Sequence, residues 1–305
     1  MIYKHESVLL HECIQGLNLK EGSRALDMTY GRGGHTSEVL NHIGRKGKLV
    51  VIDCDQEAID DARQKYSNDD RVEIIHDQFL NAALALKKRE LCFDAVLLDL
   101  GVSSPQLDKP SRGFSFRNNG PLDMRMDQSK GETAADFVNN ATEKEIADCI
   151  YHLGDETYAR VIASEIVKQR PLSTTDELAN IVRQVKPKRH SKVDPATKTF
   201  QAIRVKINHE LDQIEKVLPL LLSSMSLHGR MAIISFQGHE QFLVKSFVKR
   251  FKAGKLNKYP VSTPPSPTVQ SPKLTCIERV KPSKVSPLSN RRARSALLTI
   301  LERVS

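Results

Sequence analysis

The chain has 305 residues, which is enough for one large domain or two smaller ones, each with a real core. Its five cysteines are widely spaced and include no CxxC pair, which argues against a zinc site or a disulfide framework and favours a reducing cytoplasm. No stretch approaches the roughly 18 apolar residues of a membrane span, and the first residues have no apolar export signal, so neither membrane insertion nor secretion is expected.

The stretch from Asp27 to Thr36, DMTYGRGGHT, lies where a strand should end and a helix should begin. Residues 23–26 are short and strand-like, and residues 36–43 carry apolar side chains at helical spacing. Glycines at such a junction let a ligand approach the backbone and the first amides of the helix. Taken alone, these glycines are a weak signal, and an ordinary glycine turn into a helix explains them about equally well.

The acidic residue of this motif favours one cofactor over another. A dinucleotide-binding loop holds a pyrophosphate, which Asp27 would repel, and Thr36 stands where the third glycine of that fingerprint belongs. S-adenosylmethionine carries a sulfonium and an ammonium group and no phosphate, so a nearby carboxylate attracts it. The motif therefore favours S-adenosylmethionine over NAD and disfavours a dehydrogenase.

Strand and helix patterns alternate through the first hundred residues. An opening helix is expected to reach Leu17, and buried-type strands are expected at 48–53, 71–76 and 93–99, with a helix at 56–65. This alternation predicts an α/β fold with a parallel, doubly wound sheet. Acids stand at or just past the ends of successive strands, where open α/β sheets bind ligands: Asp27, Asp53, Asp77 and Asp99. Each acid alone could be a helix N-cap or turn residue, but four at one edge predict a ligand site.

Two residues at that edge have specific candidate roles. Asp53 follows Gly31 by about twenty residues, a spacing that suits a carboxylate accepting hydrogen bonds from ribose hydroxyls. Phe79 could offer an apolar face to an adenine ring, although a buried core aromatic explains it about as well.

After Asp99 the alternation stops. The segment 112–127 is long, poorly periodic and dense in Gly, Arg and Asp, and such loops are usually functional or disordered. Helical spacing follows from about 134 to 185, and strands are expected again at 231–236 and 297–301. We therefore expect an α/β domain built from residues 1–108 and 208–305, interrupted by a helical substrate-recognition domain at 109–207.

The net charge of +9 is concentrated near the C-terminus. Residues 242–305 contain 14 Lys and Arg against only Glu278 and Glu302. Such a segment is typical of a nucleic-acid binder; a solvated, partly disordered tail is the alternative, which the proline-rich stretch 259–268 favours. Candidate RNA contacts occur in both the insertion and the tail: Lys186, Lys188, Arg189, Lys192, Lys198, Arg204, Arg291, Arg292 and Arg294.

Six sequence runs together resemble one family over nearly the whole chain: DMTYGRGGHT, DLGVSSPQLD, RGFSF, GPLDMRMD, DPATKTFQAIRVKIN and NRRARSA. They are similar to the RsmH (MraW) family, bacterial methyltransferases acting on the exocyclic N4 of a cytidine in the decoding region of 16S rRNA. The resemblance implies a Rossmann-like class I methyltransferase domain with an inserted helical domain, S-adenosyl-L-methionine as methyl donor, and 16S rRNA in the small ribosomal subunit as partner. Carried onto the matching positions, it implies cofactor contacts at Gly33, Gly34, His35, Asp53, Phe79, Asp99 and Gln106.

The chain departs from the family pattern in two places. Family members read close to FHSLEDRIVK where residues 236–245 read FQGHEQFLVK, and Ser7 replaces a proline usual in the opening HxPVLL motif. Glu240 and Lys245 are retained, whereas a His-Ser pair and an Asp-Arg pair are lost. If those groups contact RNA or position the base, affinity or rate is expected to be lower, while the cofactor motifs are intact.

The chemistry of the expected reaction adds a candidate acceptor. An exocyclic cytosine amine is a poor nucleophile because its lone pair is delocalised into the ring, so the site must align it and accept one of its hydrogens. We expect that acceptor at Asp99 or in the loop around Ser104, which resembles the signature of amino-methyltransferases only loosely. No cysteine nucleophile is required for chemistry at N4.

Other functions remain open from the sequence. A methyltransferase acting on a small molecule would share the α/β half but has no use for the basic segment, and one acting on another RNA would share both. A non-catalytic RNA-binding protein would share the basic segment but not the strand-end acids. Separate binding measurements with S-adenosylmethionine, NAD and 16S rRNA would distinguish these classes.

Overall fold

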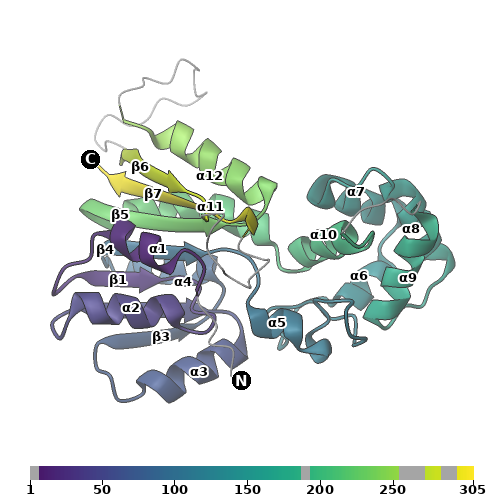
Figure 1. Ribbon diagram of the computed structural model, residues 1–305, viewed down its shortest axis with the longest axis horizontal. Helices are drawn as coiled ribbons and strands as arrows, with labels where there is room; N and C mark the ends of the chain where they lie inside the picture. The colour runs from purple at the N-terminus through teal and green to yellow at the C-terminus, as the bar shows by residue number, and fades with distance from the viewer. Residues whose placement is uncertain (1–6, 187–192, 254–271, 283–293) are drawn as a thin grey trace. The chain divides into compact units, whose positions relative to one another are not determined.

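The computed structural model describes residues 7–186, 193–253, 272–282 and 294–305. The chain forms two compact units (Figure 1): a sheet unit, residues 1–101 and 211–305, and a helical unit, residues 102–210. The sequence predicts the inserted helical domain at residues 109–207, whereas the helical unit spans 102–210. The unit therefore begins and ends a few residues outside the predicted bounds. The assignment of the helical unit to substrate recognition is carried forward as a proposal.

The sheet unit is built on seven strands in the order β3-β2-β1-β4-β5-β7-β6. Strands β1 to β5 are parallel, and β7 runs antiparallel between β5 and β6. The doubly wound α/β sheet expected from the sequence is thereby confirmed. The strands are β1 Arg24–Asp27, β2 Lys48–Asp53, β3 Val72–His76, β4 Phe93–Asp99, β5 Met225–Ser235, β6 Leu274–Val280 and β7 Leu297–Arg303.

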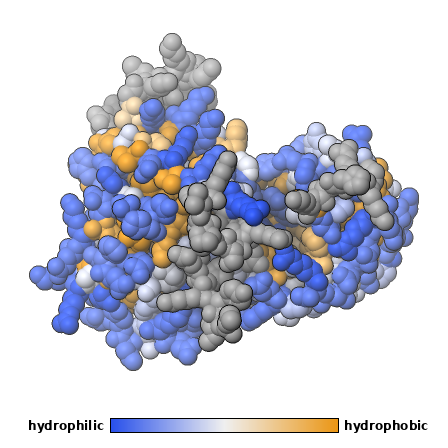
Figure 2. All heavy atoms as spheres, in the orientation of Figure 1, coloured by the Kyte–Doolittle hydropathy of each residue, from blue (hydrophilic) through white to orange (hydrophobic). Residues whose placement is uncertain are grey.

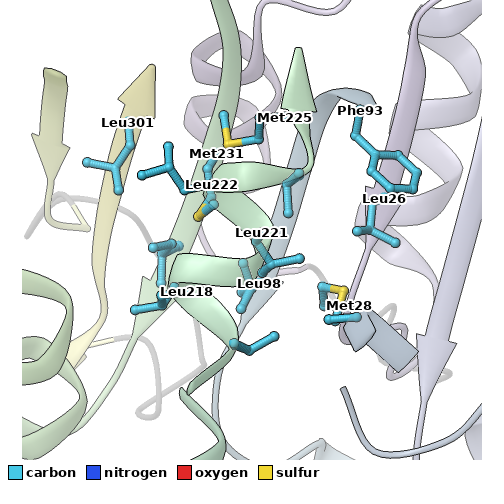
Figure 3. Close-up of a cluster of buried hydrophobic side chains, with 14 of the residues drawn as sticks. Leu26, Met28, Phe93, Leu98, Leu218, Leu221, Leu222, Met225, Met231 and Leu301 are labelled. Atoms are coloured by element: carbon cyan, nitrogen blue, oxygen red, sulfur yellow. The ribbon is translucent and has the colours of Figure 1, made fainter. Parts of the chain in front are cut away.

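Helices cover both faces of the sheet. Along β4, Ala95 and Leu97 pack with the helices of one face, and Val96 and Leu98 with those of the other, as the two-residue period of a strand requires. Figure 3 shows the core on the face that contains Val96 and Leu98, where Leu218 and Leu221 lie over the strands. The first face carries α1 Leu10–Leu17, α2 Gly34–Ile43 and α3 Gln56–Tyr66; the second carries α4 Phe79–Lys88, α11 Glu210–Ser223 and α12 Gly238–Phe251.

The sheet reverses its winding between β1 and β4. From β1 the chain continues to β2 and β3 on one side, whereas β4 and β5 follow on the other. In doubly wound sheets the crevice for a ligand opens at the carboxyl ends of the two strands that flank such a point. Here those strands end at Asp27 and Asp99.

The helical unit has a core of its own, drawn from α6 to α10 and the preceding loop. Four of its helices begin with a capping box, in which a hydroxyl residue and an acid or amide three residues later each bond the other's backbone N–H: Ser103 with Gln106, Thr133 with Asp136, Thr142 with Glu145, and Thr174 with Glu177. The helices are α5 Ser104–Asp108, a 3-10 turn at Pro110–Arg112, α6 Ala134–Asn140, α7 Glu143–Gly154, α8 Ala159–Lys168, α9 Thr175–Val185 and α10 Thr197–Ile207.

The long loop before α6 is held by polar contacts within the helical unit. The buried guanidinium of Arg112 donates to the carbonyls of Arg125 and Met126. Asn208 accepts from Met126 N and donates to the carbonyl of Met124, at 2.7 and 2.8 Å. Gly113 has a φ of +73°, and a Cβ there would collide with the Pro121 carbonyl. The RGFSF and GPLDMRMD motifs thus fix the path of this loop.

Hydrophilic residues cover most of the face shown in Figure 2, with apolar patches between them. Within the described parts of the chain, no helix has the length and apolar character needed to cross a membrane. All five cysteines are described, and all are free thiols.

Candidate active site

The glycine-rich loop between β1 and α2 is shaped by steric requirements at its end. Gly33 has a φ of +74°, and a Cβ there would come within 2.6 Å of the Tyr30 hydroxyl. A Cβ on Gly34 would collide with the hydroxyl of Ser7, the residue that stands in place of the family proline. The backbone conformation therefore requires glycine at position 33, whereas a side chain at position 34 would displace the Ser7 hydroxyl.

Three side chains, from β2 and α3, form hydrogen bonds with the loop. Asp53, at the end of β2, accepts the Gly31 N–H at 2.8 Å. Asp61 of α3 accepts the Tyr30 hydroxyl, and Lys65, one turn later, donates to Asp61 and to the Arg32 carbonyl, at 2.7, 2.7 and 3.0 Å. Burial of Asp61 favours the neutral carboxyl, but the bonds from Lys65 and Tyr30 outweigh it and lower its pKa. Each residue from 30 to 32 is thus anchored separately, and we call the Tyr30–Asp61–Lys65 set the loop latch.

Asp27 is buried beneath the loop. Its carboxylate accepts the Thr36 hydroxyl at 2.6 Å and the Thr29 N–H at 3.1 Å. Burial raises the pKa of Asp27 to about 6, against the opposing effect of the Thr36 and Thr29 bonds. Because both oxygens are bonded inside the protein, Asp27 influences a ligand through its charge and through the residues it positions.

Asp99 lies at the carboxyl end of β4 with one oxygen unused. Its backbone N–H donates to the Thr29 hydroxyl at 2.7 Å, which ties it to the glycine-rich motif. Among the described residues Oδ1 has no hydrogen-bond partner, and Oδ2 lies 3.8 Å from His35 Nδ1, too far for a hydrogen bond. Burial, then the charges of Asp27 and Glu240, raise the pKa of Asp99 to about 8.

His35, in the first turn of α2, is the second buried group with unused capacity. Its Nε2 has no partner in the described chain. Burial lowers the pKa of His35 to about 4, so the imidazole is neutral at pH 7. The His35–Asp99 approach is therefore no ion pair at neutral pH.

Asp53 keeps a position suited to a ligand, whereas Asp77 does not. The Asp53 carboxylate accepts N–H groups from Gly31 and Asp55, and burial raises its pKa to about 6 against those bonds. Asp77 Oδ1 accepts from Gln78 N and from the Asn81 side chain within its own turn, which is the ordinary role of such an acid. Phe79 opens α4 and packs, partly buried, against the core of that face.

The segment that departs from the family pattern begins α12. Glu240, which is buried, accepts the Phe236 and Gln237 N–H groups at 2.7 and 3.0 Å, and it forms a capping box with Gln237. The retained glutamate thus fixes the start of the helix, and Gln237 supplies the N-cap.

Comparison with known proteins decides the family. A model described as the MraW methylase family matches residues 2–304. This chain belongs to the MraW methylase family. The ribosomal RNA small subunit methyltransferase H of Methylobacillus flagellatus is 42% identical over 312 residues, covering 100% of this chain and 96% of that protein. Proteins of the same name from Shewanella sediminis and Legionella pneumophila strain Corby are each 42% identical, over 311 and 308 residues, and cover 99% of this chain and 98% and 99% of their own lengths.

Membership of this methylase family confirms the expected fold class, a Rossmann-like class I methyltransferase, and S-adenosylmethionine as its methyl donor. The described site fits such a ligand, because two buried polar atoms, Asp99 Oδ1 and His35 Nε2, lack partners. Three carboxylates with raised pKa favour a cation over a phosphate there: Asp27, Asp53 and Asp99. No group of three His, Cys, Asp or Glu side chains in the described residues could hold a metal ion.

The other candidate residues are placed as follows. Ser104 opens α5, and Gln106 is buried and accepts the Ser103 N–H at 2.9 Å, so both belong to the helical unit. Arg204 is engaged by both oxygens of Glu210, at 2.8 and 2.9 Å, with side chains 13% and 8% exposed. The charge of Arg204 is thus paired within the fold, and its contact with RNA stays a prediction.

The remaining basic candidates divide into described and undescribed residues. Lys186 pairs with the buried Glu156 at 2.6 Å, a second charge engaged inside the helical unit. Lys198 is exposed, although its amine donates to the Asp155 carbonyl, and Arg294 is exposed just before β7. Lys188, Arg189, Lys192, Arg291 and Arg292 lie outside the described residues.

Sequence reasoning missed the loop latch and the two threonines beside Asp27. Thr29 and Thr36 stand inside the motif, two and nine residues after Asp27, and their hydroxyls were an available signal. Asp61 and Lys65 show the i, i+4 spacing of an ordinary surface ion pair, and nothing in that spacing indicates the loop.

Proposed function

We propose that this chain transfers the methyl group of S-adenosylmethionine to the exocyclic N4 of a cytidine in the decoding region of 16S rRNA, in the small ribosomal subunit and in the cytoplasm. Full-length similarity to relatives named ribosomal RNA small subunit methyltransferase H carries this proposal. The strand-end carboxylates supply the chemistry that the reaction requires.

Residues of the sheet unit would hold the cofactor. Asp53 has lone pairs left for ribose hydroxyls after accepting two backbone N–H groups. Gly33 and Gly34 allow close approach to the backbone, Phe79 offers part of its ring, and His35 offers Nε2. Gln106 stays a candidate from the helical unit. When bound, S-adenosylmethionine supplies an electrophilic methyl group on a sulfonium sulfur.

Asp99 is the proposed acceptor of an amine hydrogen. Its Oδ1 accepts no hydrogen bond from the described part of the chain, so it can orient the cytosine amine and draw a hydrogen away from the nitrogen. Only the carboxylate form can do this, and positive charge nearby lowers the pKa of an acid and so favours that form. Ser104, five residues further along the chain, is the second candidate acceptor.

Recognition of the RNA is assigned to the helical unit and to the basic C-terminal segment. The candidates are Lys188, Arg189, Lys198, Arg204, Arg291, Arg292 and Arg294. Each phosphate contact releases counterions, so binding should weaken steeply as salt rises.

The test is direct. Purified protein, labelled S-adenosylmethionine and either naked 16S rRNA or assembled small subunits are incubated, and the methylated nucleoside is identified by mass spectrometry. We expect N4-methylcytidine at a single position, with Asp99→Asn greatly reduced in turnover and little changed in RNA affinity. A methyl group on another atom or on another RNA would overturn the assignment.

A further inference from the structure

The outward face of α12 differs in character from the face that it buries. Val244, Phe247 and Val248 pack into the core that covers the sheet. On the opposite side Phe242, Lys245, Ser246 and Lys249 are all exposed and follow the i, i+3, i+4, i+7 spacing of one helix face, which Arg250 extends. Figure 1 shows α12 against β6, and we call its exposed stripe the α12 outer face.

This face carries only positive charge. The one acid of α12, Glu240, is buried at its start and bonds backbone N–H groups. Among the described residues no carboxylate forms an ion pair with Lys245, Lys249 or Arg250. The helix dipole favours cations in its last turn and explains Lys249 and Arg250. It does not explain Lys245, which lies in the middle of the helix.

Phe242 heads the stripe and is unusually open to water. Its exposed fraction of 67% is the largest of any large apolar side chain in the described chain. An aromatic ring left in water beside cations contributes little to folding. Proteins that bind single-stranded nucleic acid combine exposed aromatic rings with cations in this way. The rings stack on bases, and the cations contact the phosphate backbone.

The head of α12 lies at the edge of the sheet where the proposed chemistry takes place. The helix follows β5 directly, so its first turn stands at the carboxyl ends of the parallel strands. Asp99 pairs with Ile234 across β4 and β5, and Glu240 accepts the Phe236 N–H two residues further along the chain, which places the start of α12 near Asp99. Gln241 donates to the Ser295 carbonyl at 3.2 Å, next to the exposed Arg294. A cofactor on β1 and β2 leaves the β5 and β7 side for the substrate.

We infer that the α12 outer face binds single-stranded RNA next to the target nucleotide, with Phe242 stacking on a base and Lys245, Lys249 and Arg250 contacting phosphates. The identity of the RNA rests on the proposed function. An enzyme that draws one base into a pocket must hold the flanking chain, and a basic track beginning beside the pocket does so.

Two sets of variants test this inference. Lys245 and Lys249 are changed together to Gln, and Phe242 separately to Ala. The matched controls lie on α4, which covers the same face of the sheet: Lys87 and Lys88 to Gln at its C-terminal end, and Leu84, 43% exposed, to Ala. Affinity for a labelled fragment of 16S rRNA is measured across a salt series, alongside affinity for S-adenosylhomocysteine and the sedimentation behaviour.

The double lysine variant should reduce the magnitude of the slope of log affinity against log salt by about 1.4. This is the change expected when two phosphate contacts to a single strand are lost, at about 0.7 for each contact. Phe242→Ala should weaken binding by about 5- to 100-fold with little change of slope. The α4 variants and all affinities for S-adenosylhomocysteine should match wild type. Wild-type slope and affinity in the α12 variants would overturn the inference, as would a change of oligomeric state in Phe242→Ala, which would make this face a protein interface. Failure of wild type itself to bind the rRNA fragment would count against the proposed function.

Discussion

At the scale of single residues, the site combines three carboxylates that the fold makes costly to ionise. Asp27 and Asp99 end the two strands that flank the change of winding, and Asp53 ends the next. Their pKa values are raised mainly by burial, and no cation from the described chain is placed to neutralise Asp99. Such destabilised groups are characteristic of sites that gain their partner charge from a ligand.

Asp99→Asn should make the ligand-free protein more stable at high pH. A raised pKa means that the folded state holds the proton more tightly than the unfolded state does. The contribution of Asp99 to stability is therefore fully present below about pH 4 and is lost as pH rises through about 8. Denaturant unfolding of wild type and variant should show a difference that grows by about 1 kcal/mol or more between pH 5 and pH 8. A difference that is flat with pH would contradict the environment described for Asp99.

Asp53→Ala should weaken S-adenosylmethionine binding by about 1.5–3 kcal/mol, the usual value of hydrogen bonds to a charged group. The variant loses the acceptor for ribose hydroxyls and also frees the Gly31 N–H. Asp77→Ala, at the end of the next strand, provides the control because the Asp77 carboxylate accepts from Gln78 and Asn81 within its own turn, and its backbone bond to Asp53 is kept in the variant. Calorimetry that finds equal affinities in the folded Asp53 variant and wild type would exclude this role.

At the scale of elements, the sequence predicts the strands and helices whose bounds depend on neighbouring residues in the chain. Strands β2 and β4 have the predicted bounds because each contains an apolar run, residues 49–52 and 95–98, that is followed directly by an acid. Strand β6 escaped prediction because, as an edge strand with mostly exposed or half-exposed residues, it lacks such a run. The path of the loop before α6 could not be predicted either, since it depends on hydrogen bonds to Asn208, which lies more than 80 residues away in the chain.

The same distinction applies to the site. Asp53 and Asp99 follow from strand ends, but the loop latch joins the glycine-rich loop to α3 through a contact between Tyr30 and Asp61, 31 residues apart. Neither residue is marked by periodicity. Arg204 shows what the sequence does not reveal about a basic residue, because its ion pair with Glu210 is visible only in the fold.

Loosening the latch should affect cofactor binding more than folding. Tyr30→Phe keeps the buried ring and removes the hydroxyl that bonds Asp61, so the loop loses one of its three anchors. We expect affinity for S-adenosylhomocysteine to fall by about 10-fold, the lower end of the effect of one hydrogen bond to a charged partner. Asp61→Asn should give a similar loss, and the two changes combined should be less than additive because they remove one interaction.

The adjacent residue offers the control for this series. Asp60 lies on the exposed side of α3 and accepts a hydrogen bond from Gln56, away from the loop. Asp60→Asn should bind S-adenosylhomocysteine like wild type. If it weakened binding as much as Asp61→Asn, the effect would be one of general charge, and the latch would have no specific role.

At the scale of the whole molecule, acidic and basic residues are concentrated in different parts of the chain, each suited to a different ligand. The acids with raised pKa gather at one edge of the sheet, suited to a cationic cofactor, while the basic excess lies in the C-terminal part of the chain, suited to a polyanion. The α12 outer face brings part of that basic excess to the same edge. The proposed reaction requires this arrangement, because a cation and a polyanion must be bound side by side.

Cofactor binding should therefore release protons. In the ligand-free protein Asp27, Asp53 and Asp99 are partly protonated near neutral pH, and a bound cation favours their ionised forms. Affinity for S-adenosylmethionine should rise from pH 5 and level off above about pH 8, and calorimetry in buffers of different ionisation heat should report protons released at pH 7. S-adenosylhomocysteine, whose sulfur is neutral, should release fewer. Equal release by the two ligands would place the acids away from the sulfonium, and affinity that falls as pH rises would reverse the sign of the linkage and contradict the site.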